Sequence, residues 1–311
     1  MKPVVLKFGG ELLEDPQQVA ALASAIAKLR KHKPLLPLVI VHGGGREIDA
    51  SLARVGIEKR QIDGLRITDE PTLDVVVSVL AGLVNTRFVA ALGAAGVPGV
   101  GLTGADAGIG RVRRAAPHVT TTGDTVDLGR VGEPVGREKP ALLDDLCRKG
   151  YVPVVSSIGA SREGLLFNVN ADTLAAHLAG RLQSPRLIIA GATAGVLARD
   201  GSTIAEMTFR DVDALIKSGG ATAGMVAKLA ACRSAIESGA REVFVADGKD
   251  LPGLAILARH GRAAGAGKST RISHGTPASS RKPQGWPRSG AGHGAPASGA
   301  AGAGRRGPRD Q

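Results

Sequence analysis

Short runs rich in β-branched residues alternate with longer helical patterns over the first 259 residues of the chain. Such alternation predicts βαβ units, in which helices connect the strands of a mainly parallel sheet. Aromatic residues make up only 2% of the chain, so Val, Leu, Ile and Ala must fill the core. Those residues suit helices packed on a parallel sheet. The sequence therefore predicts an α/β fold, a three-layer αβα sandwich around a mainly parallel sheet.

The expected elements follow one another with short connections. Residues 110–131 have alternating β character without helix signals and predict a hairpin at the sheet edge. The expected strands cover residues 3–8, 38–41, 99–102, 152–156, 187–190 and 242–246, and the expected helices cover residues 17–31, 72–95, 142–149, 171–179, 209–217, 225–238 and 251–259.

The composition changes at residue 261, where Gly, Ala, Pro, Ser and Arg begin to dominate. Residues 260–311 hold nine lysines and arginines against one acid, Asp310, so they supply +8 of the net charge of +12. A segment of this composition buries too little apolar surface to offset its ordering entropy. We expect residues 261–311 to be a disordered basic tail. Its charges lack interleaved aromatic residues, which makes nucleic acid an unlikely partner.

The cysteines and the apolar runs indicate where the protein works. Cys147 and Cys232 lie far apart without metal-type spacing, a pattern that fits a reducing compartment. No hydrophobic run is expected to approach the roughly 18 residues that span a membrane. The first residues begin a strand rather than a signal peptide. These features predict a soluble cytoplasmic protein without membrane contact.

Two glycine clusters follow directly on predicted strands. They are Lys7-Phe8-Gly9-Gly10 and His42-Gly43-Gly44-Gly45. Glycines at such turns let backbone N–H groups approach an anion, and the N-terminus of a following helix adds unpaired N–H groups. Neither cluster has the spacing of a P-loop or of a dinucleotide-binding loop. Together they predict an anion site, with His42 as a hydrogen-bonding residue at a strand end.

Two later motifs carry charged residues at the starts of helices. Asn168-Val169-Asn170-Ala171-Asp172 enters a helix, so Asn170 is a candidate cap and Asp172 falls in the first turn. That turn lies at the end of the sheet, where ligands of α/β proteins collect. Lys228 stands in an otherwise apolar helical stretch, where a lysine is usually a surface residue whose stem is buried.

The order of these motifs resembles that of the N-acetylglutamate kinases, a family within the amino-acid kinase superfamily. The resemblance rests on the two glycine clusters, Gly64-Leu65-Arg66-Ile67-Thr68, residues 168–172 and Gly224-Met225-Val226-Ala227-Lys228, all in the family's order. It runs from residue 2 to about residue 250. The resemblance implies the amino-acid kinase fold, with residues 1–160 as the half for acceptor substrate and dimerisation and residues 161–260 as the half for ATP.

The resemblance also implies roles for single residues. Lys7 and Lys228 would flank the transferring phosphoryl group, and Asp172 would hold both ammonium groups. N–H groups of the glycine clusters would cover the phosphates, and Arg66 would read the α-carboxylate of the substrate through its planar fork. The implied phosphate contacts are Gly9, Gly10 and Gly44, the substrate contacts Gly44, Gly45, Arg66 and Asn168, and the further ATP contacts Ala192, Gly195, Leu197, Gly220 and Thr222.

The implied chemistry needs no general base, because a side-chain carboxylate is already an anion at neutral pH. Catalysis would rest on positioning and on cationic and N–H stabilisation of the spreading charge. ATP would come with Mg²⁺, held chiefly by ATP oxygens and water, so no protein metal ligand is expected. The resemblance further implies a homodimer with residues 72–92 at the interface. The family's arginine-sensitive members carry a helix before the first strand. Here the first strand is expected at residues 3–8, with no such helix ahead of it, which predicts arginine insensitivity.

The chain departs from the family on the nucleotide side. Ala192 stands where the family usually has Asp, and Ala223 stands where an Asp often precedes Gly-Met. Two alternatives therefore stay open beside acetylglutamate phosphorylation. One is an impaired kinase fold that binds ligands without turnover. The other is a kinase for a related acidic substrate, such as carrier-linked aminoadipate.

Overall fold

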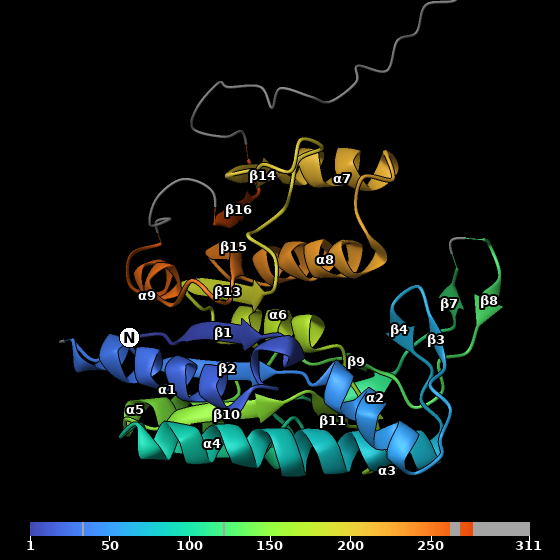
Figure 1. Cartoon of the computed structure of the whole chain (residues 1–311), viewed down its shortest axis with the longest axis horizontal. Helices are drawn as coiled ribbons and strands as arrows, with labels where there is room; N and C mark the ends of the chain where they lie inside the picture. The colour runs from blue at the N-terminus through green and yellow to red at the C-terminus, as the bar shows by residue number, and fades with distance from the viewer. Residues whose placement is uncertain (33, 121, 262–267, 276–311) are drawn as a thin grey trace, which may run out of the picture. The chain divides into compact units, whose positions relative to one another are not determined.

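An eight-stranded sheet forms the centre of the protein in the computed structural model, which describes residues 1–32, 34–120, 122–261 and 268–275. Its strand order is β14-β16-β15-β13-β1-β2-β10-β5, and Figure 1 shows most of this order as a stack from β14 to β10. Every neighbouring pair is parallel except β15 and β16, which confirms the mainly parallel sheet. The strands are β1 (Val4–Phe8), β2 (Leu38–His42), β5 (Gly99–Thr103), β10 (Val152–Ser156), β13 (Arg186–Gly191), β14 (Glu206–Thr208), β15 (Glu242–Asp247) and β16 (Ser269–Ser273).

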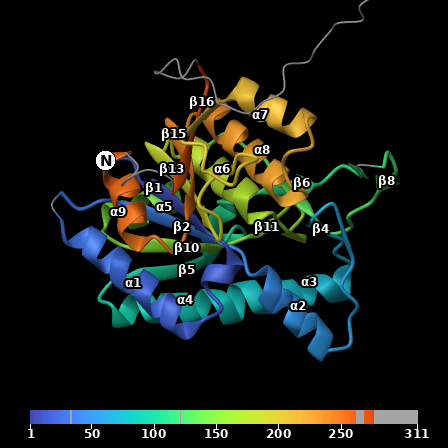
Figure 2. The same ribbon diagram turned by 45° about the horizontal axis from the view of Figure 1, so that its top comes forward.

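Helices cover both faces of this sheet, as the sequence predicts (Figure 2). On one face, Leu6 and Phe8 of β1 join a buried apolar cluster with α1 (Pro16–Lys31), α4 (Asn85–Ala94) and α9 (Leu251–His260). Side chains alternate between the faces of a strand, so residues 5 and 7 of β1 point to the opposite face. That face is covered by α6 (Ala171–Arg181), which packs on β1 and β13, and by α8 (Ala223–Glu237), which packs on β15. The remaining helices of more than one turn are α2 (Gly45–Arg54), α3 (Glu70–Val77), α5 (Ala141–Arg148) and α7 (Phe209–Lys217), and η1 (Gly10–Leu12) and η3 (Asp106–Gly108) are single 3₁₀ turns.

One continuous helix covers residues 70–94, close to the predicted span, with a π-helical segment at Ser78–Val84 between α3 and α4. By length and composition alone this helix could cross a membrane, with a mean hydropathy of 1.9 over its most apolar stretch. The prediction that the chain has no such stretch is therefore wrong, because small apolar residues lengthen the run without forming an obvious block. The helix packs on β5 and α1 instead, but only 39% of the apolar stretch is buried.

The segment at residues 110–131 forms hairpins, but these lie outside the main sheet. In the described part of this segment, β6 pairs with β9 and β7 pairs with β8, each as a separate two-stranded sheet. The prediction of an edge hairpin is corrected here, because β5 forms that edge and an alternating pattern does not specify its pairing partner. The small strands are β3 (Gln61–Ile62), β4 (Leu65–Arg66), β6 (Val112–Arg114), β7 (His118–Val119), β8 (Thr125–Val126), β9 (Gly132–Pro134), β11 (Ile158–Ala160) and β12 (Leu166–Asn168).

Strand β16 corrects the predicted boundary of the basic tail. Ser269–Ser273 inserts between β14 and β15, with Thr270 and Ile272 buried. Five residues within a stretch of Gly, Ala and Arg carry too weak a local signal to predict a strand. The segment becomes a strand through its pairing with β14 and β15. The rest of the predicted disorder falls on residues 262–267 and 276–311, outside the described residues. The main sheet contains strands from both sides of residue 160, since β1 pairs with both β2 and β13. The division into two functional halves at that residue stays a prediction.

Candidate functional site

Three charged residues from distant parts of the chain meet at the sheet face that carries α6 and α8. The Nζ of Lys7 lies 2.8 Å from Oδ1 of Asp172, and the Nζ of Lys228 lies 2.8 Å from Oδ2 of the same carboxylate. Lys7 reaches this face because it alternates with Leu6 and Phe8 along β1. Lys7 and Asp172 are each only 7% exposed. The structure thus brings together the three residues predicted to be catalytic.

Asp172 is held in place by the start of α6. The side chain of Asn170 accepts hydrogen bonds from the backbone N–H groups of Asp172 and Thr173, which confirms it as the helix cap. Burial acts to raise the pKa of Asp172, but the charges of Lys7 and Lys228 outweigh it and lower this pKa to about 2. The carboxylate is therefore ionised at neutral pH, with one oxygen for each ammonium group.

The two glycine clusters approach each other beside this triad. A Cβ atom on Gly10 would lie 2.7 Å from the Cα of Gly44, so the first loop tolerates no side chain at Gly10. Gly44 caps α2, and Gly45 is the first residue of that helix. The N–H groups of a first helical turn have no partner within the helix. This turn therefore offers donors for an anion.

The backbone N–H of Gly9 has a partner within the sheet. It donates to the carbonyl of Ala190 at 3.0 Å, because the pairing of β1 with β13 extends one residue beyond the strand. That N–H is therefore not available to a phosphate group in this arrangement. A Cβ at this position would lie 2.2 Å from Oε1 of Glu11, so a side chain there would displace the Glu11 carboxylate.

His42 ends β2 in a fully buried position. Its Nδ1 lies 3.0 Å from the carbonyl oxygen of Gly43, and its Nε2 lies 3.0 Å from Nδ2 of Asn85. Burial lowers the pKa of His42 to about 4, with a further contribution from the nearby charge of Lys7. These contacts confirm His42 as a hydrogen-bonding residue at the strand end. Asn85 carries no signal in the sequence, because it lies within a continuous helical pattern.

Two histidines, the fully buried His42 and the half-buried His177, make the fold sensitive to acid. The pKa values of His42 and His177 are both lowered to about 4 by burial, so in acid the unfolded chain binds protons that the folded protein does not. Stability is therefore complete above the ordinary pKa of 6.5 and is lost as the pH falls towards 4. For His42 the loss is on the order of 3 kcal/mol. Urea unfolding between pH 7.5 and 4.5 measures it, and a flat profile in wild type would contradict the prediction. The His177→Gln variant should show a shallower profile.

The residues predicted to bind the acceptor form a connected set. Nη2 of Arg66 donates to the carbonyl of Gly45 at 3.3 Å and pairs with Asp49. Nδ2 of Asn168 donates to Oγ1 of Thr68 at 3.2 Å, two residues along from Arg66. The remaining guanidinium nitrogen of Arg66, Nη1, is buried without a hydrogen-bond partner in the described residues. An orphaned cationic donor fits a carboxylate ligand.

The predicted ATP contacts lie on two segments. One is the loop after β13, where the exposed Ala192 is followed by Gly195 and Leu197. A Cβ on Gly195 would lie 2.6 Å from Oγ1 of Thr270, whose hydroxyl also accepts from the N–H of Val196. The other segment precedes α8. There Gly220 packs against Leu215, and the Thr222 side chain caps α8 by accepting from the N–H of Met225. The sequence missed Thr270, which lies in β16.

Within the described residues, no group of three or more His, Cys, Asp or Glu side chains could hold a metal ion. Mg²⁺ in kinases usually takes many of its ligands from substrate phosphates and water. The glycine loops and the two lysines fit the phosphates that would bring the ion.

Sequence comparisons identify relatives of the chain. The model of the amino acid kinase family matches residues 2–247. Acetylglutamate kinase from Brucella anthropi is 40% identical over 252 residues, which are 80% of this chain and 84% of that protein. Acetylglutamate kinase from Brucella canis is 39% identical over the same shares. The resemblance found from the motifs is thereby confirmed.

Solved structures share the fold. N-acetylglutamate synthase from Neisseria gonorrhoeae, complexed with coenzyme A and N-acetyl-glutamate, superimposes with a TM-score of 0.71 at 25% identity. The match covers 88% of this chain but only 60% of the synthase chain. Carbamate kinase from Giardia lamblia, bound to AMP-PNP, has a TM-score of 0.61 at 17% identity and is covered to 99%. By family model, sequence identity and fold, the chain belongs to the amino acid kinase family.

Proposed function

We propose that this protein is an ATP-dependent kinase that phosphorylates the side-chain carboxylate of N-acetyl-L-glutamate to an acyl phosphate in arginine biosynthesis. The observation that carries the proposal is the Asp172 carboxylate, which holds Lys7 and Lys228 at 2.8 Å each beside two glycine loops. The acetylglutamate kinases at 39–40% identity support the choice of acceptor.

The geometry suits transfer between two anions. An oxygen of the substrate carboxylate attacks the γ-phosphorus of ATP, and the bond to ADP breaks with its electron pair leaving on ADP. No proton moves, because the acceptor is already ionised. Lys7 and Lys228 neutralise the charge that spreads over the phosphoryl oxygens, and N–H groups of Gly10 and Gly44 donate to it. Asp172 fixes both lysines without touching the substrate.

Arg66 would orient the acceptor. Its guanidinium is held by Asp49 and the Gly45 carbonyl, which leaves the unpartnered Nη1 for the α-carboxylate of the substrate. Asn168, fixed through Thr68, would bind the acylated end. The adenine nucleotide would lie against residues 192–197 and 220–222. When bound, Mg²⁺ would screen the β- and γ-phosphate charges, held by phosphate oxygens and water.

Replacing Arg66 by alanine is expected to raise the KM for N-acetylglutamate by about 100-fold, the loss of one charge-assisted contact. The KM for ATP should stay within about twofold, because Arg66 belongs to the acceptor set. Steady-state kinetics measures both constants. Arg60→Ala is the matched control, since Arg60 pairs with Asp69 on the surface. A rise of equal size in the KM for ATP would contradict this role.

The function is tested by trapping the acyl phosphate as its hydroxamate. We expect turnover with N-acetylglutamate to exceed that with glutamate, aspartate and aminoadipate. ATP binding in calorimetry without turnover on any substrate would instead identify an impaired kinase fold, in line with Ala192 in place of the family's Asp. Faster turnover with carrier-linked aminoadipate would identify the alternative acceptor.

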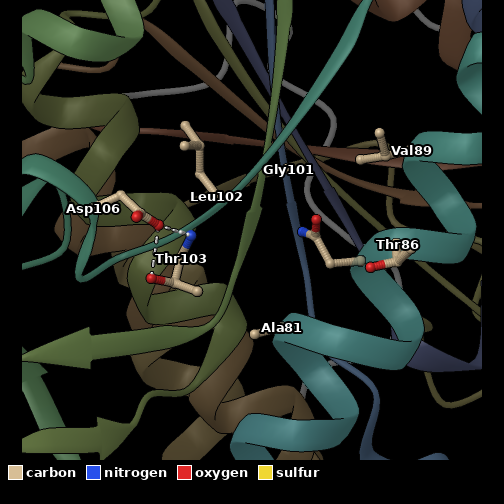
Figure 3. Close-up of a pocket in the computed structure, with 8 residues that line it drawn as sticks. Ala81, Thr86, Val89, Gly101, Leu102, Thr103 and Asp106 are labelled. Atoms are coloured by element: carbon tan, nitrogen blue, oxygen red, sulfur yellow. Dashed lines mark hydrogen bonds between the residues drawn. The ribbon is translucent and has the colours of Figure 1, made fainter.

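We also propose a homodimer. Strand β5 is an open edge of the main sheet, and the adjoining apolar helix at residues 70–94 is only 39% buried over its apolar stretch. A pocket of about 260 Å³ lies at this face. Figure 3 shows its two sides, with Thr103 hydrogen-bonded to Asp106 on one and Ala81 and Thr86 on the helix opposite. A second copy would cover this edge, and sedimentation equilibrium would distinguish a dimer from a monomer.

We propose a cytoplasmic location. Cys147 and Cys232 are both free and buried, and burial raises the pKa of each thiol to about 12. Thiols of this kind are unreactive packing residues, which supports a reducing compartment.

A further inference from the structure

The imidazole of His42 has a definite tautomer, set by Asn85. Nδ2 of Asn85 lies 2.9 Å from the carbonyl oxygen of Val154 and 3.0 Å from Nε2 of His42. A carbonyl only accepts, so this atom of Asn85 is the NH₂ group, which has one hydrogen for each neighbour. Nε2 of His42 therefore accepts and carries no proton. The proton of the neutral ring lies on Nδ1, which donates to the carbonyl of Gly43 at 3.0 Å.

That last hydrogen bond controls a catalytic donor. The carbonyl of Gly43 and the N–H of Gly44 belong to one planar trans peptide, so they point in opposite directions. Holding the carbonyl towards the buried imidazole turns the Gly44 N–H away from the core, to the side where α2 begins. Glycine has few steric restraints on its backbone, so without this hydrogen bond the Gly43–Gly44 peptide could adopt other orientations.

We propose that His42 and Asn85 are positioning residues that fix the Gly43–Gly44 peptide, so that the Gly44 N–H is aimed at the phosphoryl group before substrate binds. Burial supports the role, since His42 is fully buried and Asn85 is 4% exposed, which leaves both side chains little freedom. His42 acts through Gly43 and transfers no proton. Asn85 also lines the pocket at the open β5 edge. The contacts from Asn85 to His42 and from His42 to Gly43 therefore connect that pocket to the glycine loop.

The first test is spectroscopic and does not depend on turnover. Long-range ¹⁵N–¹H NMR of histidine-labelled protein at pH 7 should show the His42 ring protonated on Nδ1 and unprotonated on Nε2. The His42→Asn variant assigns the signal by its disappearance. A proton on Nε2 would overturn the proposal, because the bond to Gly43 would then lack its donor.

The second test separates positioning from packing. His42→Leu should lower kcat by roughly 10- to 100-fold at 15 °C, where the fold is checked by circular dichroism, because a donor is displaced. His42→Asn should recover most of kcat, since its amide places an N–H where Nδ1 lies. His177→Leu is the matched control, because His177 is a half-buried histidine on α6 with a similarly lowered pKa. It should lose stability with little change in kcat.

The kinetic test of His42 rests on the proposed function. Its outcomes distinguish a failure of that function from a failure of the positioning role of His42. If wild type turns over no acceptor, the proposed function fails, while the NMR result and ADP affinity by calorimetry still test the loop. Weaker ADP binding in His42→Leu, restored in His42→Asn, supports the proposal in that case. Wild-type kcat and ADP affinity in a folded His42→Leu protein would overturn it. If the leucine variant does not fold, His42→Asn and the NMR tautomer decide.

Discussion

Replacing Lys228 by alanine is expected to lower kcat by about 10³-fold, the scale at which one preorganised donor to a developing charge contributes. The ammonium of Lys228 is held at 2.8 Å from Asp172 and faces the same site as Lys7. It stabilises charge that spreads in the transition state, so kcat should fall far more than the KM for either substrate rises. Single-turnover formation of the hydroxamate measures the chemical step directly.

The control for this variant is Lys217→Ala, which removes an exposed lysine from α7 and should leave kcat unchanged. Lys7→Ala should match Lys228→Ala in size. The double variant should lose less than the product of the two single effects, because residues that act as one unit are not additive. A Lys228→Ala enzyme with kcat within fivefold of wild type would remove Lys228 from the catalytic set.

Replacing Asp172 by asparagine is expected to damage both stability and turnover. The carboxylate is ionised and separates two ammonium groups in a site where Lys7 is 7% exposed. Removing the central anion leaves the buried Lys7 and the partly buried Lys228 facing each other, and breaking a buried ion pair costs about 3–5 kcal/mol. Urea unfolding at pH 7 measures the loss of stability, and kcat at 15 °C should fall by about 100-fold or more because the lysines lose their orientation.

The pH dependence of this effect has a definite window. The pKa of Asp172 is lowered from 3.8 to about 2, so its contribution is complete above pH 3.8 and is lost as the pH falls to about 2. This window lies below that of the histidines. Asp213→Asn is the matched control, because it removes a half-exposed carboxylate paired with Arg233 and should cost no more than about 1 kcal/mol. Wild-type stability and kcat in Asp172→Asn would show that other groups hold the lysines.

The sequence predicted those parts of the site that local pattern and motif order specify. A lysine between two apolar residues of a strand had to point away from them, and Asn170 followed by Asp172 marked a helix start. The Arg66 motif was recognised, but its pairing with Asp49 was not, because nothing in the spacing of residues 49 and 66 indicates contact. Asn85 was missed for the same reason. A polar residue inside an apolar helix looks the same in sequence whether it faces solvent or a buried histidine.

The fold shows the same limit. Parallel strands with strong apolar character were predicted close to their observed bounds, since burial on both faces leaves a continuous signal. Strand β16 was not, because Ser269–Ser273 is polar enough to pass for loop and is a strand only through its pairing with β14 and β15. Gly9 shows another limit. The sequence does not reveal that its N–H is used by the extended pairing with Ala190.

The pairing of β1 has a consequence for how the chain is made. The strand that carries Lys7 pairs on one side with β2, about 35 residues later, and on the other with β13, about 180 residues later. On the ribosome β2 emerges early, while one edge of β1 stays open until residues 186–191 have been synthesised. An open apolar edge is a template for aggregation. Pauses in translation before residue 191 should therefore reduce the yield of folded protein more than pauses after it.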